Sequence, residues 1–216
     1  GQLDGSIELQ EQCDWSKSYR AAFSAQGVLY IKGTPRSRPV AEITSALHEV
    51  CPALVPEVLN ADLLPEHPWR WFLLENRGEC DHNQITPERA AKAAYHLGRL
   101  QRGMCQHVRL AAYLPQCRAD GLQKSAVDVC EWMLQTATGA MRNEILAIQA
   151  RIMRSTSFFR AQQKILARLP NTIVHGDFWS GNIAYREGEV SFIDWGDAFW
   201  GVGSISIVNL LASASE

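Results

Sequence analysis

Residues 175–182 read HGDFWSGN, and residues 193–195 read IDW. Together they place Asp177, Asn182 and Asp194 in one order along the chain. Protein kinases carry a base Asp, then a metal-binding Asn after four residues, and a second metal-binding Asp further on. The order and spacing of the three residues therefore predict a phosphoryl-transfer site and a fold that brings both motifs together.

A short hairpin is predicted between the two motifs. Residues 183–186 and 190–193 alternate around Glu187-Gly188-Glu189, a pattern typical of two strands joined by a tight turn. Such a hairpin would fold Asp194 back beside Asn182.

The residue types suit the chemistry of phosphoryl transfer. Mg²⁺ prefers oxygen ligands, so Asp194 and Asn182 are candidate metal ligands. Asp177 would accept the proton of an attacking hydroxyl or orient it. His175 is interpreted as a residue that braces the loop rather than as a base. An alternative remains open, because Asp and Asn are abundant in loops, where they bond to local backbone amides.

The chain resembles the aminoglycoside phosphotransferase and choline kinase family, whose signature is HGD, four residues, N, then IDW. The residues that carry the resemblance are Ile173 to Asp177 and Phe192 to Gly196. The resemblance implies Asp177 as catalytic base and Asn182 and Asp194 as magnesium ligands. It also implies that the chain should continue through several more helices beyond Glu216, so we expect a piece truncated at its C-terminus.

The order of elements predicts an α+β, protein-kinase-like fold with two lobes. Strands are expected first and helices later, and the change falls near residues 75–80. We therefore expect an N-terminal nucleotide-binding lobe at residues 1–77 and a helical catalytic lobe, incomplete, at residues 78–216. The expected strands cover residues 19–23, 27–32, 58–59 and 69–74, and the expected helices cover residues 39–50, 86–103, 126–134, 140–169 and 201–215.

The N-terminal lobe carries candidates for nucleotide binding. Lys32 closes an apolar strand, where its ammonium could reach the α- and β-phosphates, and Glu42 on the next helix could pair with it. Glu49 is the rival partner. The phosphate-covering turn, residues 14–18, lacks the glycines of protein kinases, so Ser16 and Ser18 are its candidate phosphate-binding residues, or else solvated turn residues.

Other candidates lie at the hinge and around the second motif. Backbone groups near Glu75 and Asn76 would read the purine, although an ordinary edge strand fits as well. Trp195 is expected to pack the catalytic loop. Asn209 stands where the family usually has Asp, so a brace formed by that residue should be weaker.

Composition narrows the class of protein. A net charge of −2 from 21 basic and 23 acidic residues gives no excess for binding nucleic acid. The six cysteines are scattered without metal-binding spacing, which favours reduced thiols in a cytoplasmic protein. No stretch approaches the roughly 20 apolar residues that span a bilayer, so no membrane partner is expected. The oligomeric state is not predicted.

These observations predict an enzyme, a phosphotransferase that uses ATP or GTP with Mg²⁺ to phosphorylate a hydroxyl of a small molecule. By resemblance the acceptor would be an aminoglycoside. Choline, another amino-alcohol or a sugar is the alternative acceptor, and a noncatalytic nucleotide-binding pseudokinase is the alternative of another class. The residues that would bind the acceptor are expected beyond Glu216.

Overall fold

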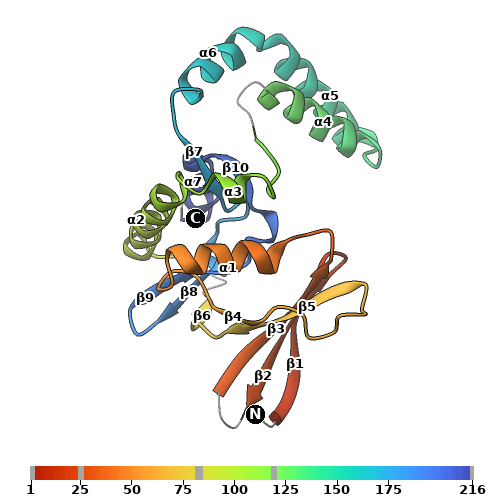
Figure 1. The fold of residues 1–216 in the computed structure, drawn as a ribbon. Helices are drawn as coiled ribbons and strands as arrows, with labels where there is room; N and C mark the ends of the chain where they lie inside the picture. Colours follow the sequence, from red (N-terminus) through yellow and green to blue (C-terminus); the bar gives the residue numbers. More distant parts are fainter. Residues whose placement is uncertain (1–2, 24–26, 81–84, 118–120, 215–216) are drawn as a thin grey trace.

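The architecture comes from a computed structural model that describes residues 3–23, 27–80, 85–117 and 121–214, with the side chains of residues 3–6, 108, 122, 209 and 212–214 outside the description. It is an α+β arrangement in which an antiparallel sheet is followed by a region rich in helices (Figure 1). The predicted fold class is confirmed.

The N-terminal sheet has five antiparallel strands in the order β1-β2-β3-β5-β4. Its strands are β1 (Leu3–Cys13), β2 (Ser16–Phe23), β3 (Gly27–Pro35), β4 (Val58–Asn60) and β5 (Trp69–Glu75). Four of these strands were predicted. β1 was not, because it is an edge strand in which Ile7 and Leu9 are exposed and two irregularities interrupt its pairing with β2.

Helix α1 (Val40–Val50) crosses between the sheet and the rest of the chain (Figure 1). It buries one stripe, which includes Ile43 and Leu47, as its three- and four-residue spacing predicts. Pro39 precedes the first helical residue. The helix therefore lies where predicted, and its first turn faces the segment that follows the IDW motif.

The second half contains α2 (Pro87–Met104), whose N-cap Thr86 accepts a hydrogen bond from Arg89 N as predicted. It also contains two small sheets. One pairs β7 (Asn171–Val174) with β10 (Phe199–Val202), and the other has the order β6-β8-β9 with β6 (Glu79–Cys80), β8 (Ile183–Arg186) and β9 (Glu189–Phe192). The predicted hairpin is thus confirmed as β8–β9.

The helix predicted for residues 201–215 is wrong in its first part. Residues up to Val202 belong to β10, Gly203–Ile205 form a 3-10 turn, and α7 covers only Ser206–Ala214. Gly201 and Val202 are in a strand rather than a helix because β10 pairs with β7, which lies earlier in the sequence.

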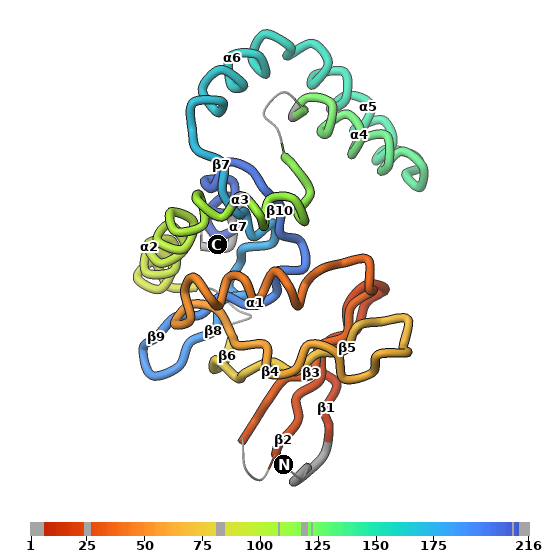
Figure 2. The backbone as a smooth tube through the Cα atoms, in the orientation of Figure 1, coloured from red at the N-terminus to blue at the C-terminus, as the bar shows by residue number. Residues whose placement is uncertain are grey.

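Helices α4 (Leu122–Leu134), α5 (Gly139–Arg154) and α6 (Thr156–Leu166) stand away from the sheets, and the backbone returns from α6 to β7 (Figure 2). A short helix, α3 (Val108–Ala111), precedes them. Helices α4–α6 have a core of their own, which consists of Cys130, Ala137 and Ile145 with two partly buried neighbours. No helix in the described ranges is long and apolar enough to cross a membrane.

The largest core runs across the molecule. It joins Ile43 and Leu47 of α1 to Leu97 of α2 and to Phe192 and Trp195 at the end of the β8–β9 hairpin. The helix of the first half and the HGD and IDW motifs of the second half are therefore packed against one another.

Candidate functional site

The loop that carries Asp177 is held by close backbone packing. Gly176 has a φ of +81°, and a Cβ at this position would lie 2.0 Å from Asp197 O. Only glycine combines that conformation with such an approach. The glycine of the HGD motif therefore allows the loop after β7 to press against the segment after the IDW motif.

His175 ties the same two segments together. It is fully buried, and its Nε2 lies 2.8 Å from Ile193 O, so Nε2 carries the proton and donates it. Its ring centroid lies 4.4 Å from that of Trp195. Burial lowers the pKa of His175, and the bond to Ile193 O and the nearby carboxylates oppose this shift only in part. A neutral, immobile imidazole fits a bracing residue better than a base.

Asn182 fixes the carboxylate of Asp177. It lies at the end of a 3-10 turn (η2, Ser180–Asn182), and its Nδ2 donates to Asp177 O at 2.8 Å and to Asp177 Oδ2 at 2.9 Å. Both donations use the amide nitrogen, which leaves the amide oxygen for another partner. Ile193 N donates to Asn182 O at 3.1 Å, so the hairpin does bring the two motifs side by side.

Asp194 forms an ion pair with Lys32, which lies far away in the sequence. Lys32 Nζ lies 2.6 Å from Asp194 Oδ1, and Gly196 N donates to the same oxygen at 3.3 Å. Asp194 has left-handed backbone angles of φ 58° and ψ 67°. Burial alone would raise the pKa of Asp194, but the Lys32 ammonium outweighs it and the pKa lies below its ordinary value. Asp194 is therefore held as a carboxylate.

Lys32, Asp177 and Asp194 line a cavity of about 230 Å³. Ser16 and Thr34 line it too, and both hydroxyls are buried without a hydrogen-bond partner among the described residues. Lys17 pairs with Gly33 in the β2–β3 register, so Ser16 and Thr34 face one another at the next position. Buried hydroxyls are normally bonded, so these two indicate a missing acceptor.

The predicted ion pair between Lys32 and Glu42 is wrong. Glu42 is exposed and pairs with Arg70 of β5, while the described partner of Lys32 is Asp194. The reason is the orientation of α1, whose buried stripe turns Glu42 outward. The rival Glu49 is exposed on the same helix.

Three other predicted residues lie outside the cavity. Ser18 pairs with Lys32 in the β2–β3 ladder and is half-buried, but it does not line the cavity. Glu75 bonds to Arg77 at 2.8 Å, and its backbone N–H already donates to Glu57 O. Asn76 accepts from Gly78 N at 2.9 Å. Backbone groups near Glu75 and Asn76 were predicted to read a purine, and use of the Glu75 N–H for this would require breaking its bond to Glu57 O.

Trp195 and Asn209 are the remaining residues predicted near the site. Trp195 is fully buried, and its Nε1 donates to Phe192 O at 3.1 Å. Asn209 lies within α7, but its side chain is outside the described residues. Among the described residues, no group of three or more His, Cys, Asp or Glu is placed to hold a metal ion.

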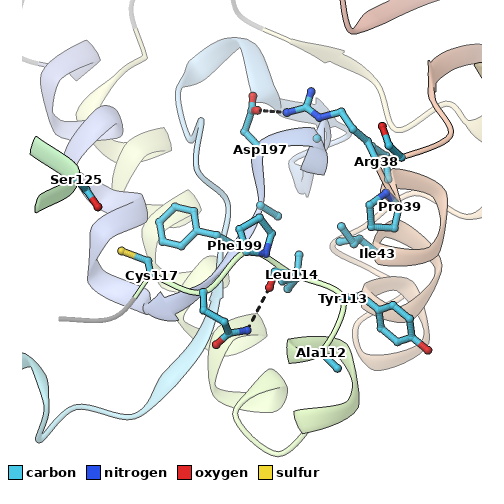
Figure 3. Close-up of a pocket in the computed structure, with 16 residues that line it drawn as sticks. Arg38, Pro39, Ile43, Ala112, Tyr113, Leu114, Cys117, Ser125, Asp197 and Phe199 are labelled. Carbon is cyan, nitrogen blue, oxygen red and sulfur yellow. Dashed lines mark hydrogen bonds and ion pairs between the residues drawn. The ribbon is translucent and has the colours of Figure 1, made fainter. Parts of the chain in front are cut away.

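A second cavity of about 650 Å³ shares lining residues with the first. Figure 3 shows the residues that line it. Arg38 and Asp197 face one another at one end of it and Ala112 lies at the opposite end, with Phe199 between them. Arg38 Nη2 donates to Asp197 Oδ1 at 2.8 Å. Apart from this pair, the described residues that line the cavity are uncharged.

Sequence reasoning missed Thr34, Arg38 and Asp197. Thr34 follows Lys32 by two positions, and in a strand such residues share a face, so this signal was available. Arg38 and Asp197 are 159 positions apart, and no local pattern links them.

The sequence matches the phosphotransferase enzyme family (APH) over residues 29–212. No protein of curated function matches it.

Several solved structures share the fold at low sequence identity. Amicoumacin kinase in complex with AMP-PNP, Ca²⁺ and its ligand has a TM-score of 0.60 at 14% identity, covering 96% of this chain and 63% of that one. The streptomycin–ATP complex of aminoglycoside phosphotransferase APH(2")-IIa has 0.56 at 17%, covering 98% and 78%. A choline/ethanolamine kinase family protein from Mesorhizobium loti has 0.54 at 15%, covering 98% and 67%.

Proposed function

Since this chain belongs to the phosphotransferase enzyme family, we propose that it moves the γ-phosphoryl group of ATP or GTP to a hydroxyl of a small molecule. The observation that carries this proposal is the meeting of Lys32, Asp177 and Asp194 on one cavity, with Asn182 bonded to Asp177. Each of these residue types has a role in phosphoryl transfer, and they come from distant parts of the chain.

The cavity suits the phosphates of a nucleotide. Lys32 supplies a positive charge, and the hydroxyls of Ser16 and Thr34, which have no partner among the described residues, would find acceptors in phosphate oxygens. Side chains on β2 and β3 thereby take over part of the role that backbone amides of a glycine-rich loop play in protein kinases. Similar structures hold ATP or its analogue AMP-PNP.

Asp194 and Asn182 would hold Mg²⁺. The oxygens that remain are Asp194 Oδ2 and the amide oxygen of Asn182, because Lys32 and Gly196 use Asp194 Oδ1 and Asp177 uses the amide nitrogen. Two protein ligands suffice for an ion that keeps several waters and binds substrate phosphates. When bound, the ion would neutralise charge on the β- and γ-phosphoryl oxygens.

Asp177 would orient the acceptor hydroxyl and take its proton. The hydroxyl oxygen forms a bond to the γ-phosphorus as the bond from that phosphorus to the bridging oxygen of the β-phosphate breaks, which leaves ADP or GDP. The bonds from Asn182 hold the Asp177 carboxylate in place. His175 holds the loop itself through Ile193 O.

The 650 Å³ cavity beside the phosphate cavity is the proposed space for the acceptor. An aminoglycoside is the first acceptor class to test, since similar structures bind hygromycin B or streptomycin. Choline, another amino-alcohol or a sugar is the second class. Residues 1–77 would then hold the nucleotide, and residues 78–216 would carry the catalytic motifs.

A noncatalytic nucleotide-binding protein is the competing function. The unpredicted partner of Glu42 supports it, because active protein kinases pair the strand Lys with a helix Glu. The presence of Asp177, Asn182 and Asp194 supports the enzyme.

Replacement of Asp177 decides between the two. Asp177→Asn should lower phosphoryl transfer from ATP to a panel of aminoglycosides, amino-alcohols and sugars by about 10² to 10⁴, because the hydroxyl loses its base. AMP-PNP affinity, measured by calorimetry, should change little. Asp128→Asn on α4 is the matched control, because Asp128 is an exposed residue paired with Lys124. Equal transfer by Asp177→Asn and parent would exclude this role of Asp177, and transfer to no acceptor by a parent that binds nucleotide would favour the pseudokinase.

The metal assignment has its own test. Asp194→Ala should abolish the dependence of AMP-PNP binding on Mg²⁺, because one of two protein ligands is lost. Titrations with and without Mg²⁺ measure this dependence. If the variant keeps the dependence of the parent, Asp194 is not a metal ligand.

A further inference from the structure

Arg38 lies at the junction of the two cavities. Arg38, Gly196 and Asp197 line both the 230 Å³ cavity and the 650 Å³ cavity. Arg38 belongs to the connection between β3 and α1, so it comes from the N-terminal half, while the other two follow the IDW motif. Among the described residues that line the smaller cavity, Lys32 and Arg38 are the cations.

The guanidinium approaches the reacting groups around Gly196. A Cβ built on Gly196 would lie 3.1 Å from Asp194 Oδ1 and 4.0 Å from Arg38 Nη1. Both groups therefore lie within 4.0 Å of one point, and Asp194 Oδ1 also touches Lys32 Nζ. Glycine at this position leaves room for the guanidinium near the Asp194 carboxylate.

The present partner of Arg38 can be exchanged. Its described side-chain hydrogen bond goes from Nη2 to Asp197 Oδ1, and the side chains are 33% and 54% exposed. Ion pairs exposed to this degree contribute little to stability. A phosphoryl group offers more charge than one carboxylate, and the planar guanidinium can donate two parallel hydrogen bonds to its oxygens.

We propose that Arg38 binds the phosphoryl group while it passes from the nucleotide to the acceptor, and that Asp197 holds the guanidinium until nucleotide enters. The proposal rests on the proposed phosphotransferase function. It gives the two cations different tasks. Lys32, on β3 and held by Asp194, binds the phosphates that stay on the nucleotide. Arg38, at the passage to the acceptor cavity, stabilises the charge on the group that moves.

The test compares Arg38→Met, which keeps the length of the side chain, with the parent. We expect ADP affinity within about threefold, AMP-PNP affinity reduced about tenfold, and phosphoryl transfer or ATP hydrolysis reduced by about 10² to 10³, the range seen when one transition-state donor is removed. The two nucleotides differ in the terminal group, so their affinities separate contact with that group from contact with the rest. Arg38→Lys should recover part of the loss, since it restores charge without the fork.

Asp197→Asn is the control for a merely structural pair. If Arg38 acts only by bonding to Asp197, this variant should reproduce the losses of Arg38→Met. If Arg38 binds phosphoryl, it should raise AMP-PNP affinity, because a competing carboxylate has been removed, and should leave turnover far closer to the parent. Thermal unfolding of each variant checks that the fold is kept.

The outcomes separate this proposal from the one on which it rests. A parent that binds neither ADP nor AMP-PNP overturns the proposed function, and the role of Arg38 with it. A parent that binds both, with Arg38→Met showing parental AMP-PNP affinity and turnover, overturns the role of Arg38 alone. Equal losses in Arg38→Met and Asp197→Asn overturn it as well.

Discussion

Two regions of the molecule differ in how far they bury their large apolar side chains. One is the segment from β7 to β10, residues 171–202, and the other is the group of helices α4–α6, residues 122–166. In the first segment many large apolar side chains are buried, namely Ile173, Phe178, Ile183, Phe192, Trp195 and Trp200. In the three helices many large apolar side chains are exposed, namely Val129, Trp132, Met133, Met141, Leu146, Ile148, Met153, Phe158 and Ile165. The groups proposed for catalysis therefore stand on the part of the chain with the densest support.

This difference has a physical reason. Reacting groups must be held to within about half an ångström, and only side chains locked by packing and hydrogen bonds achieve this. The bonds of Asn182 to Asp177 and of His175 to Ile193 are such restraints. Helices α4–α6 have a core of their own and carry none of the proposed catalytic residues. Their contribution to stability should be correspondingly small.

Replacing one tryptophan in each region should show the largest difference in stability between the two regions. Trp195→Ala should lower the free energy of unfolding by about 3 to 5 kcal/mol, because it empties a fully buried site. Trp132→Ala, at a side chain that is 70% exposed, should change it by less than about 0.5 kcal/mol. Urea unfolding followed by circular dichroism gives both values. Similar losses would show that α4–α6 are as firmly packed as the segment from β7 to β10. If Trp195→Ala does not fold, Trp195→Phe should show a smaller loss in the same direction.

Replacing one glycine in each region tests how tightly the two backbones are packed. Gly139 at the start of α5 has a φ of +56° with no atom near a Cβ, so Gly139→Ala should cost about 1 to 2 kcal/mol from conformation alone. Gly176→Ala adds the collision with Asp197 O and should cost about 2 to 5 kcal/mol. The same unfolding experiment compares them. An equal cost would mean that the Asp177 loop can move away from Asp197 without penalty.

Protonation of His175 in acid should lower the free energy of unfolding. The folded pKa of His175 lies below the ordinary value of 6.5, so the unfolded chain binds more protons, and stability falls as the pH drops from about 6.5 towards the folded pKa. The slope for one group is at most about 1.4 kcal/mol per pH unit. His175→Gln should remove most of it.

His96 of α2 provides the control for that titration. Its pKa is also lowered by burial, but its side chain is only half-buried, so His96→Gln should remove a smaller part of the slope. Helices α4–α6 contain no histidine. Unfolding free energies between pH 5 and 7.5 test both variants. If His175→Gln keeps the parental slope, the buried imidazole is not its source.

Much of the fold could be read from local patterns. The β8–β9 hairpin is confirmed because its turn, Glu187-Gly188, takes the positive φ values that such hairpins need. The Thr86 cap and α2 are confirmed because capping depends on residues three apart. β1 and β10 escaped prediction, since their positions depend on pairing with strands elsewhere in the chain rather than on their own composition.

By itself the sequence determined the two motifs, their order and the hairpin that joins them, because these depend on residue type and short spacing. Only the tertiary structure decided which charges meet. It paired Lys32 with Asp194 rather than with Glu42, and it paired Arg38 with Asp197. An ion pair depends on which face of a helix or strand is buried, and burial is a property of the whole packed chain.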